Sequence, residues 1–222
     1  LTTTDPCPAT PWNNRPDVFE VGRQVGVPAL DFAGFTADLA TMRTDAQADG
    51  QYFTGSGGFG YNVVLRTDDT FDLYRIDSTV SPPSGCSDPG QSDWGTWSVN
   101  TQTLLGNYAM PNNGIIFVED DVWVEGQIDS ARVTIAAGRF PETPSTYSHA
   151  TVNNDLLYTN YDGSDVISIM TQGNVNIGMV SQDDLRIDAA LVAQNGRVGR
   201  YYYRPPWWIF QRCSPYHDRT IV

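Results

Sequence analysis

Short segments of alternating hydrophobic and polar residues fill the chain between residues 113 and 199. In one of them Val175 and Ile177 flank Asn176. A period of two residues places the aliphatic side chains on one face of a β-strand and the polar ones on the other. The predicted strands are Gly114–Val118, Asp121–Glu125, Ala131–Ala136, Leu156–Tyr158, Asp165–Met170, Asn174–Gly178, Asp184–Asp188, Ala190–Val192 and Arg197–Gly199.

Turn-forming residues separate these strands, in sequences such as Glu-Gly-Gln, Gln-Gly-Asn and Gln-Asn-Gly. Strands this short cannot bury an apolar face alone, but stacking of successive rungs makes a continuous core. We therefore predict a mainly β protein in which residues 113–222 form a right-handed β-helix or solenoid-like region. A β-sandwich is the alternative, because it also has short strands at regular spacing.

A helix is predicted ahead of these strands, from residue 31 to residue 48. Its apolar residues recur at helical spacing and therefore share one face. Asp31 can cap its start, and Gly50 can end it. A stripe of this kind is typical of core packing rather than of a ligand site. The stripe consists of Phe32, Phe35, Leu39, Met42 and Ala46.

A β-hairpin is predicted at residues 59–77, where Thr67-Asp-Asp-Thr70 joins two strand-prone runs. The helix and the hairpin make a small α+β part, residues 1–112, which can pack as one unit with the β-helix-like region. Residues 78–113 are rich in Ser, Pro, Gly and Asn and are predicted as a long loop. Residues 140–149 are predicted as a second loop, which leaves the stack.

A dense run of aromatic residues follows the last predicted strand. Such a run can cap the open end of a solenoid, which is the interpretation we favour. It can also form a flat binding surface for a glycan or a protein partner. The candidate binding residues are Tyr201, Tyr202, Tyr203, Trp207 and Trp208.

The charge balance narrows the classes of partner. The chain has 222 residues, a net charge of −13 and a pI of about 4.3, so it repels nucleic acid unless basic residues are concentrated somewhere. The one modest basic concentration lies near the C-terminus and consists of Arg197, Arg200, Arg204, Arg212 and Arg219. The chain contains no Lys, which excludes Schiff-base catalysis and a P-loop lysine. It also has no apolar run long enough to predict a transmembrane segment.

The cysteines limit metal and redox chemistry. The three of them, Cys7, Cys86 and Cys213, form no Cys-x-x-Cys pair, and with only two histidines in the chain we expect no zinc site. Cys86 lies in a Pro- and Ser-rich loop that a crosslink would immobilise. We therefore favour a disulfide between Cys86 and Cys213, although spacing does not fix the connectivity.

Pairs of aspartates recur where the predicted strands turn. Asp is a common turn residue, so solvated turns are the simplest interpretation. A Ca²⁺ site and a glycosidase acid–base couple are the alternatives. Neither the EF-hand loop nor the glycine-rich calcium repeat is present, so we assign no cofactor and no metal ligand. The pairs are Asp68–Asp69, Asp120–Asp121 and Asp183–Asp184.

Arg186 is the strongest catalytic candidate, because Asp184 and Asp188 share its predicted face. Polysaccharide lyases with a β-helix commonly use a basic residue beside acidic Ca²⁺ ligands. A solvent face of alternating charge explains the same pattern more simply. Ser148 and His149 are neighbours on one loop, and no Gly-x-Ser-x-Gly elbow is present. We therefore expect no catalytic residues.

Three separated stretches are distinctive together: the helix at Asp31–Met42, the hairpin at Gly60–Tyr74 and the last strands at Asp183–Gly199. In their order and spacing they resemble the large minor-pilin-like proteins of type IV pilus systems. The resemblance covers residues 31–77 and 113–203. In that family an N-terminal apolar helix precedes an extracellular β-rich domain. The membrane and polymerisation segment of that helix is missing from this sequence, so we expect a fragment of a longer protein.

The resemblance implies a non-catalytic bacterial protein, extracellular or on the cell surface. Its role would be that of a structural or adhesive pilus component, and its partners would be other pilus or envelope subunits. A carbohydrate-active β-helix protein is the alternative, either a polysaccharide lyase or hydrolase or a binder of surface glycan. A DNA receptor at a pilus tip is a further alternative, which the negative charge disfavours.

Overall fold

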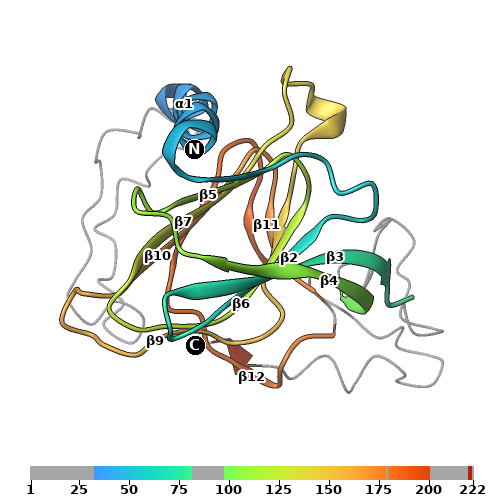
Figure 1. The fold of residues 1–222 in the computed structure, drawn as a ribbon. Helices are drawn as coiled ribbons and strands as arrows, with labels where there is room; N and C mark the ends of the chain where they lie inside the picture. Colours follow the sequence, from blue (N-terminus) through green and yellow to red (C-terminus); the bar gives the residue numbers. More distant parts are fainter. Residues whose placement is uncertain (1–32, 82–97, 179, 201–219, 222) are drawn as a thin grey trace, which may run out of the picture.

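The computed structural model describes residues 33–81, 98–178, 180–200 and 220–221, and every structural statement below concerns these residues. A helix, α1 (Ala33–Asp49), precedes a long series of mostly short strands (Figure 1). The strands are β1 (Gln51–Phe53), β2 (Tyr61–Leu65), β3 (Thr70–Thr79), β4 (Val99–Ala109), β5 (Ile115–Val118), β6 (Val122–Ile128), β7 (Arg132–Ala137), β8 (Ala150–Thr151), β9 (Leu156–Tyr158), β10 (Val166–Thr171), β11 (Val175–Ile177), β12 (Asp184–Leu185), β13 (Ala190–Ala193), β14 (Val198–Arg200) and β15 (Thr220–Ile221).

Two large sheets contain most of these strands. One is five-stranded, in the order β1-β5-β7-β10-β13. The other is eight-stranded, in the order β14-β11-β8-β6-β2-β3-β4, with β9 also paired to β6. A separate two-stranded sheet joins β12 to β15. The protein is therefore mainly β, as the alternating pattern predicts.

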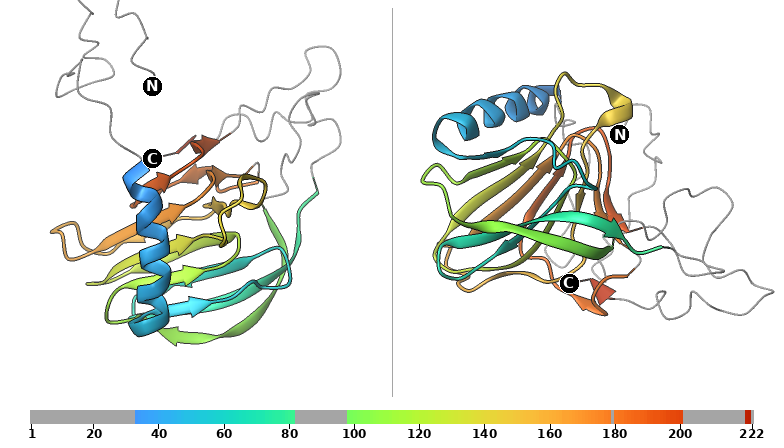
Figure 2. Two further views of the ribbon diagram at one scale, coloured as in Figure 1. Left: turned by 90° about the horizontal axis from the view of Figure 1, so that it is seen from above. Right: turned by 45° about the vertical axis from the view of Figure 1, so that its right-hand side comes forward.

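From β5 onward the chain passes back and forth between the two large sheets, apart from β9, which pairs with β6, and β12, which lies in the two-stranded sheet. The chain passes from β5 in the first sheet to β6 in the second, and then returns with β7 beside β5 and β8 beside β6. β10 and β11 continue the same advance, followed by β13 and β14, and all these neighbours are parallel. Figure 2 shows the resulting stack from two directions. Each return of the chain thus adds one strand to each sheet.

The main core lies between the two sheets. In β10, Ile167 and Ile169 are fully buried and point inward, as Ile135 does in the neighbouring β7. Val63 and Val124 enter the same cluster from the eight-stranded sheet. The two-residue period predicted this inward face, and burial of each such side chain contributes about 1.5–3 kcal/mol.

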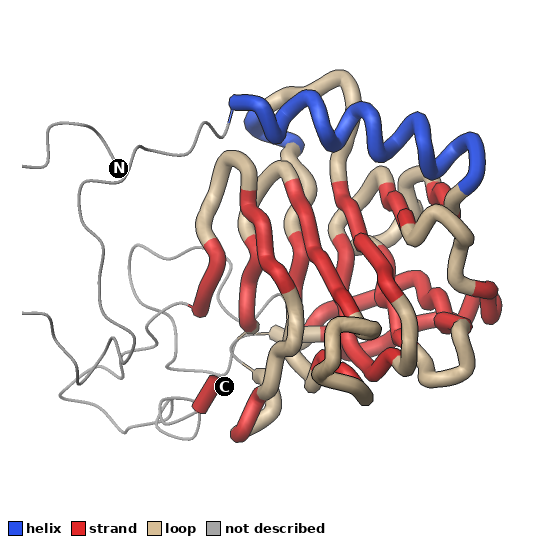
Figure 3. Tube along the Cα trace, turned by 90° about the vertical axis from the view of Figure 1, so that its left-hand side faces the viewer, coloured by secondary structure: helices blue, strands red, loops and turns tan. Residues whose placement is uncertain are grey.

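The helix covers the outer face of the five-stranded sheet. Leu39 and Ala46 of α1 pack against Phe117, Ala136 and Met170, which lie on three neighbouring strands. Figure 3 shows α1 running across the direction of these strands. The ends of β5, β7 and β10 are therefore buried on both faces, whereas β7 and β10 begin with an alternation of buried and less buried residues.

Several sequence predictions are confirmed at residue level. The predicted helix 31–48 corresponds to α1, and the predicted hairpin 59–77 corresponds to the antiparallel pair of β2 and β3. Within the helical stripe Leu39 and Ala46 are buried, and Met42 is partly buried. Residue 32 and the side chain of residue 35 lie outside what the structure describes. Each strand predicted from residue 114 onward overlaps an observed strand. The boundary between residues 112 and 113 stays a prediction.

The loop predicted at residues 78–113 is wrong for Val99–Ala109, which forms β4, a strand of 11 residues. β4 pairs antiparallel with β3 over most of its length. Most of its side chains are exposed, so its sequence carries no buried alternation that would reveal a strand. Residues 140–149 do form a loop between β7 and β8, and it includes a short 3₁₀ turn at Pro144–Thr146.

Candidate functional site

The aromatic binding residues predicted from the sequence lie outside the described residues, and so do the two cysteines of the predicted disulfide. They are Tyr201, Tyr202, Tyr203, Trp207 and Trp208, and Cys86 and Cys213. The structure therefore leaves both predictions as they stand. Three other polar assemblies lie within the described ranges. We name them the Arg186 cluster, the Arg139 cluster and the amide groove.

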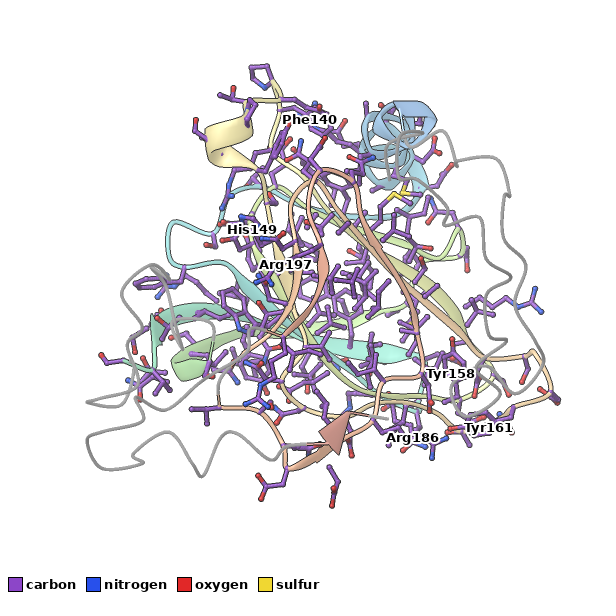
Figure 4. The ribbon with its side chains drawn as sticks, turned by 180° about the vertical axis from the view of Figure 1, so that it is seen from behind. Phe140, His149, Tyr158, Tyr161, Arg186 and Arg197 are labelled. Carbon is purple, nitrogen blue, oxygen red and sulfur yellow. The ribbon has the colours of Figure 1, made fainter. Side chains whose placement is uncertain are left out.

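The Arg186 cluster consists of Tyr161, Arg186 and Asp188, and it lies on the surface (Figure 4). Arg186 Nε donates to Asp188 Oδ1 at 3.1 Å, and the guanidinium also contacts the Tyr161 hydroxyl. Tyr161 OH donates to the second Asp188 oxygen at 2.5 Å. The guanidinium carbon lies 5.2 Å from the Tyr161 ring centroid, a cation–π geometry. Arg186 is thus held by two partners on an exposed face.

The contacts within the Arg186 cluster lower the pKa of Asp188 and raise the pKa of Arg186, so both side chains keep their charges. Burial raises the pKa of Asp188, but hydrogen bonds from Tyr161, the Tyr158 amide and Arg186 outweigh it and leave that pKa below its ordinary value. The hydrogen bond to Asp188 raises the pKa of Arg186. A guanidinium whose pKa is raised stays protonated and cannot accept a proton, so this environment opposes the role of a lyase base. Asp184 is exposed, as predicted.

The Arg139 cluster lies at the opposite end of the molecule, where Figure 4 shows His149 and Phe140. Asp120 is buried, and it accepts hydrogen bonds from the Ser56 amide at 2.7 Å and the Ser56 hydroxyl at 2.6 Å. Arg139 contacts both Asp120 and Asp121, and the His149 amide donates to Asp121 at 2.9 Å. The prediction of a solvated turn is therefore wrong for Asp120, because Ser56 and Arg139 enclose it.

The Arg139 cluster fixes the loop between β7 and β8. The Gln172 side chain accepts from the Arg139 amide at 2.8 Å and donates to the Arg139 carbonyl at 2.9 Å. His149 Nδ1 accepts from the backbone amide of Asn174 at 2.8 Å, which ties this side chain to the residue before β11. Burial raises the pKa of Asp121 above its ordinary value, against the opposing effects of the His149 amide and Arg139. These contacts bind backbone, so the cluster is structural.

The acidic pair Asp68–Asp69 lies in an ordinary turn, whereas Asp184 of the third pair begins strand β12. Asp68 lies in the turn between β2 and β3 and accepts from the Thr70 hydroxyl at 2.6 Å. That hydrogen bond lowers the pKa of Asp68. Asp69 next to it adopts a positive φ of 58°, a conformation that Asp tolerates. Within the described ranges no group of three or more His, Cys, Asp or Glu residues is placed to hold a metal ion.

The amide groove is a pocket of about 380 Å³ on the side of the eight-stranded sheet that faces away from the main core. Its volume falls in the range typical of small-ligand sites. Ser98 Oγ donates to the Val180 carbonyl at 2.9 Å and so ties the start of β4 to the segment after β11 at the groove. Its polar and aromatic lining includes Asn62, Asn100, Gln102, Trp123, Glu125, Thr151, Asn153 and Asn154.

A chain of hydrogen bonds orders the side chains in the amide groove. Asn62 Nδ2 donates to Gln102 Oε1 at 3.0 Å and to Glu125 Oε1 at 2.8 Å. The other Glu125 oxygen, Oε2, accepts from Nδ2 of the Asn154 side chain. Glu125 therefore uses both carboxylate oxygens to position amides from two different segments. This arrangement fixes which atom of the Asn62 amide is the donor and which is the acceptor.

Two buried amide oxygens on this face of the sheet lack a partner. Asn62 and Asn176 are each at most 3% exposed, and neither Oδ1 atom accepts a hydrogen bond. Strand register aligns Asn62 with Trp123, Trp123 with Thr151, and Thr151 with Asn176, so the four residues form one row across the sheet. An unsatisfied buried acceptor costs about 1–3 kcal/mol of stability. Buried polar groups without a partner are rare in folded proteins, so these two need an explanation.

Sequence reasoning did not find the amide groove. Its lining comes from residues between 62 and 180, so no local motif records it. The sequence contains one weak signal. Asn62 and Asn176 lie between hydrophobic neighbours in strands, and the alternation predicts on which face of the sheet their side chains lie, but not whether they are buried. An amide at such a position is compatible with a solvated surface, and only the folded register shows that both residues are buried in one row.

Comparisons with protein-family models, with curated proteins and with solved structures find no match to this chain. Among the described residues, no helix has the length and apolar character required to cross a membrane. Inferences about function therefore depend on the geometry described above and on the resemblance stated from the sequence.

Proposed function

We propose that this chain is a non-catalytic protein of the bacterial surface, a minor-pilin-like structural or adhesive component associated with type IV pili. The observation that carries the proposal is the position of α1. This helix immediately precedes the β-rich unit and packs across the outer face of its five-stranded sheet through Leu39 and Ala46 (Figure 3). A helix followed by a β-rich unit is the order that the family resemblance implies.

The finer architecture that we propose for the strand region is a right-handed β-helix. Support comes from the alternation of consecutive strands between two sheets and from the parallel advance of one strand per return. A continuous core along the stack is the expected energetic basis of such a coil. The antiparallel strands β3 and β4 extend the eight-stranded sheet beyond β2, where they lie next to the first rung.

Two observations support a role without catalysis. Arg186, the best catalytic candidate in the sequence, is paired with Asp188 and Tyr161, and its pKa is raised by the first of these. Asp120 is buried against Ser56 and Arg139. Groups engaged in this way stabilise the fold, whereas an acid–base mechanism requires groups that exchange protons near neutral pH.

Localisation tests the proposal. Surface filaments are sheared from the source cells, separated from envelope and medium, and probed with an antibody to this protein. We expect recovery in the filament fraction, and loss of that recovery in cells that cannot assemble pili. Recovery only as free secreted protein would rule out the pilus assignment. A cytoplasmic marker protein, blotted in parallel, controls for lysis.

A carbohydrate-active enzyme is the second candidate, and the observation that favours it is Glu125 in a groove lined with amides. Purified protein is incubated with polysaccharides, and release of reducing ends or of unsaturated products is measured. Cleavage that disappears in Arg186→Gln or Glu125→Gln, with the fold intact by circular dichroism, would support the enzyme over the structural role.

A further inference from the structure

We propose that the amide groove is a binding site for a neutral saccharide unit of a surface glycan. The inference deepens the adhesive role proposed above, because it names the surface and the class of ligand. It begins from a pocket of about 380 Å³ whose lining is supplied by β2, β4, β6, β8 and the segments that follow β8 and β11. Residues from distant parts of the chain thus meet at one site.

The polar chemistry of the groove fits hydroxyl groups. Each sugar hydroxyl both donates and accepts, and an amide side chain also offers both functions. Asn100, Gln102 and Asn154 lie exposed along the groove and present such amides. A pocket for an apolar ligand would instead be lined predominantly by hydrophobic side chains. The composition of this groove therefore favours a polyhydroxylated ligand.

Charge excludes anionic sugars from the same groove. Its described lining includes the carboxylate of Glu125 and contains no Arg. A carboxylate or sulfate on the ligand would be repelled by Glu125 and would meet no cation there. Both oxygens of Glu125 already accept hydrogen bonds from the side chains of Asn62 and Asn154, so this carboxylate is held in place. The groove thus selects for a neutral ring.

An acceptor without a partner marks where the ligand acts. Asn62 lines the groove and is 3% exposed, and among the described residues its Oδ1 atom has no hydrogen-bond donor, although both of its amide protons are donated. Gln102, which accepts one of these protons, is exposed on β4 and also lines the groove. A ligand hydroxyl that reaches Asn62 from the groove can donate to this oxygen. Binding would then satisfy an acceptor that folding leaves unpaired.

Trp123 supplies the apolar part of the recognition. It lies between Asn62 and Thr151 in the row across the sheet, and it lines the groove. Pyranose rings carry a face of C–H groups that packs on an aromatic ring while the hydroxyl groups reach polar neighbours. A single carboxylate in the described lining supports binding rather than hydrolysis, because glycosidases canonically use two.

The test uses the full 222-residue chain and saturation-transfer NMR with methyl glycosides. The neutral probes are those of glucose, galactose, mannose and N-acetylglucosamine, and the anionic probe is methyl galacturonate. We expect transfer to at least one neutral probe and none to the anionic one. Absence of transfer to every neutral probe, or equal transfer to galacturonate, would overturn the proposal.

Matched variants locate the site. Gln102→Ala removes a groove amide, whereas Asn107→Ala removes an exposed amide from the same strand at a place where it binds Thr70 and Asp72 outside the groove. We expect affinity for the positive probe to fall about tenfold in Gln102→Ala and to stay unchanged in Asn107→Ala. Equal affinities in both variants would overturn the assignment. Because shearing experiments measure only localisation, failure of glycan binding and failure of the pilus assignment are distinguishable.

Discussion

The Arg139 cluster and the Arg186 cluster use the same residue types and have opposite electrostatic outcomes. In the first, burial dominates and raises the pKa of Asp121. In the second, hydrogen bonds to the charged form dominate and lower the pKa of Asp188. The Arg139 cluster fixes backbone at a corner between the two sheets, while the Arg186 cluster lies on the surface. An Arg–Asp pair therefore has no intrinsic stabilising value, because its surroundings decide the sign.

The largest effect should come from Asp120→Asn. The side chain of Asp120 is 9% exposed, and its substitution removes the charge that pairs with the partly exposed Arg139 and weakens the hydrogen bonds from Ser56. We expect the free energy of unfolding to fall by about 2 kcal/mol, measured by urea denaturation. Asp69→Asn in the turn between β2 and β3 is the control and should change stability by less than about 0.5 kcal/mol. An equally small loss in Asp120→Asn would show that the two clusters do not differ in strength.

The pH dependence of stability should have opposite signs at the two clusters. The folded-state pKa of Asp121 is raised above the ordinary value of about 3.9. Between these two values the folded protein keeps a proton on Asp121 that the unfolded chain has released, so the free energy of unfolding falls as pH rises through this range. Asp188 behaves in reverse. Its folded pKa is lowered, so its contribution is present above the ordinary value and is lost as pH falls through the folded value.

Variants separate these two contributions. We expect Asp121→Asn to remove the loss of stability above about pH 4, and Asp188→Asn to remove a loss below it. The measurement is the free energy of unfolding in urea at intervals between about pH 3 and pH 7. The same pH profile in both variants would contradict the assignment of opposite shifts.

Asp188→Asn should have a smaller effect on stability at neutral pH than Asp120→Asn. Asp188 also accepts from the Tyr158 amide at 3.2 Å, and an Asn can keep that contact. Its partner Arg186 has a side chain that is 48% exposed, so solvent compensates much of the lost charge. We expect a loss of about 1 kcal/mol in urea denaturation. A loss as large as that of Asp120→Asn would mean that the surface cluster contributes as much to the free energy of unfolding as the Arg139 cluster does.

The two clusters also show where sequence reasoning succeeds. Strand period placed Arg186 and its acidic neighbours on an outward face, and this prediction needed only local information. The aspartate pair at 120 and 121 was interpreted as a solvated turn for equally local reasons. Its burial depends on Ser56 and Arg139, which reach it from other segments. A local pattern predicts on which face of a sheet a side chain lies, but it does not predict whether a distant segment of the chain covers that side chain.

The same limit applies to β4 and to the amide groove. The apolar period revealed the strands that bury a face, whereas the mostly exposed β4 owes its formation to pairing with β3. β4 supplies part of the groove, since Gln102 of β4 meets Asn62 of β2 across the intervening strand β3. Missing the strand therefore meant missing the site. The tertiary pairing that overrides a weak local propensity is also what creates the pocket.

The smallest expected effect tests how the surface cluster sets the pKa of Asp188. Tyr161 is 63% exposed, and its hydroxyl donates to Asp188 at 2.5 Å. Tyr161→Phe removes one of the hydrogen bonds that lower this pKa, so the pKa of Asp188 should rise toward its ordinary value, while the free energy of unfolding at neutral pH should change less than in Asp188→Asn. The carboxyl carbon of Asp188 is titrated by NMR in both proteins. Tyr147→Phe, in the loop at the opposite cluster, should leave the titration unchanged. If Asp188 titrates identically in Tyr161→Phe, then Arg186 and the Tyr158 amide alone lower its pKa. The two clusters would then differ only in that burial sets the pKa of Asp121, whereas Arg186 and a backbone amide set that of Asp188.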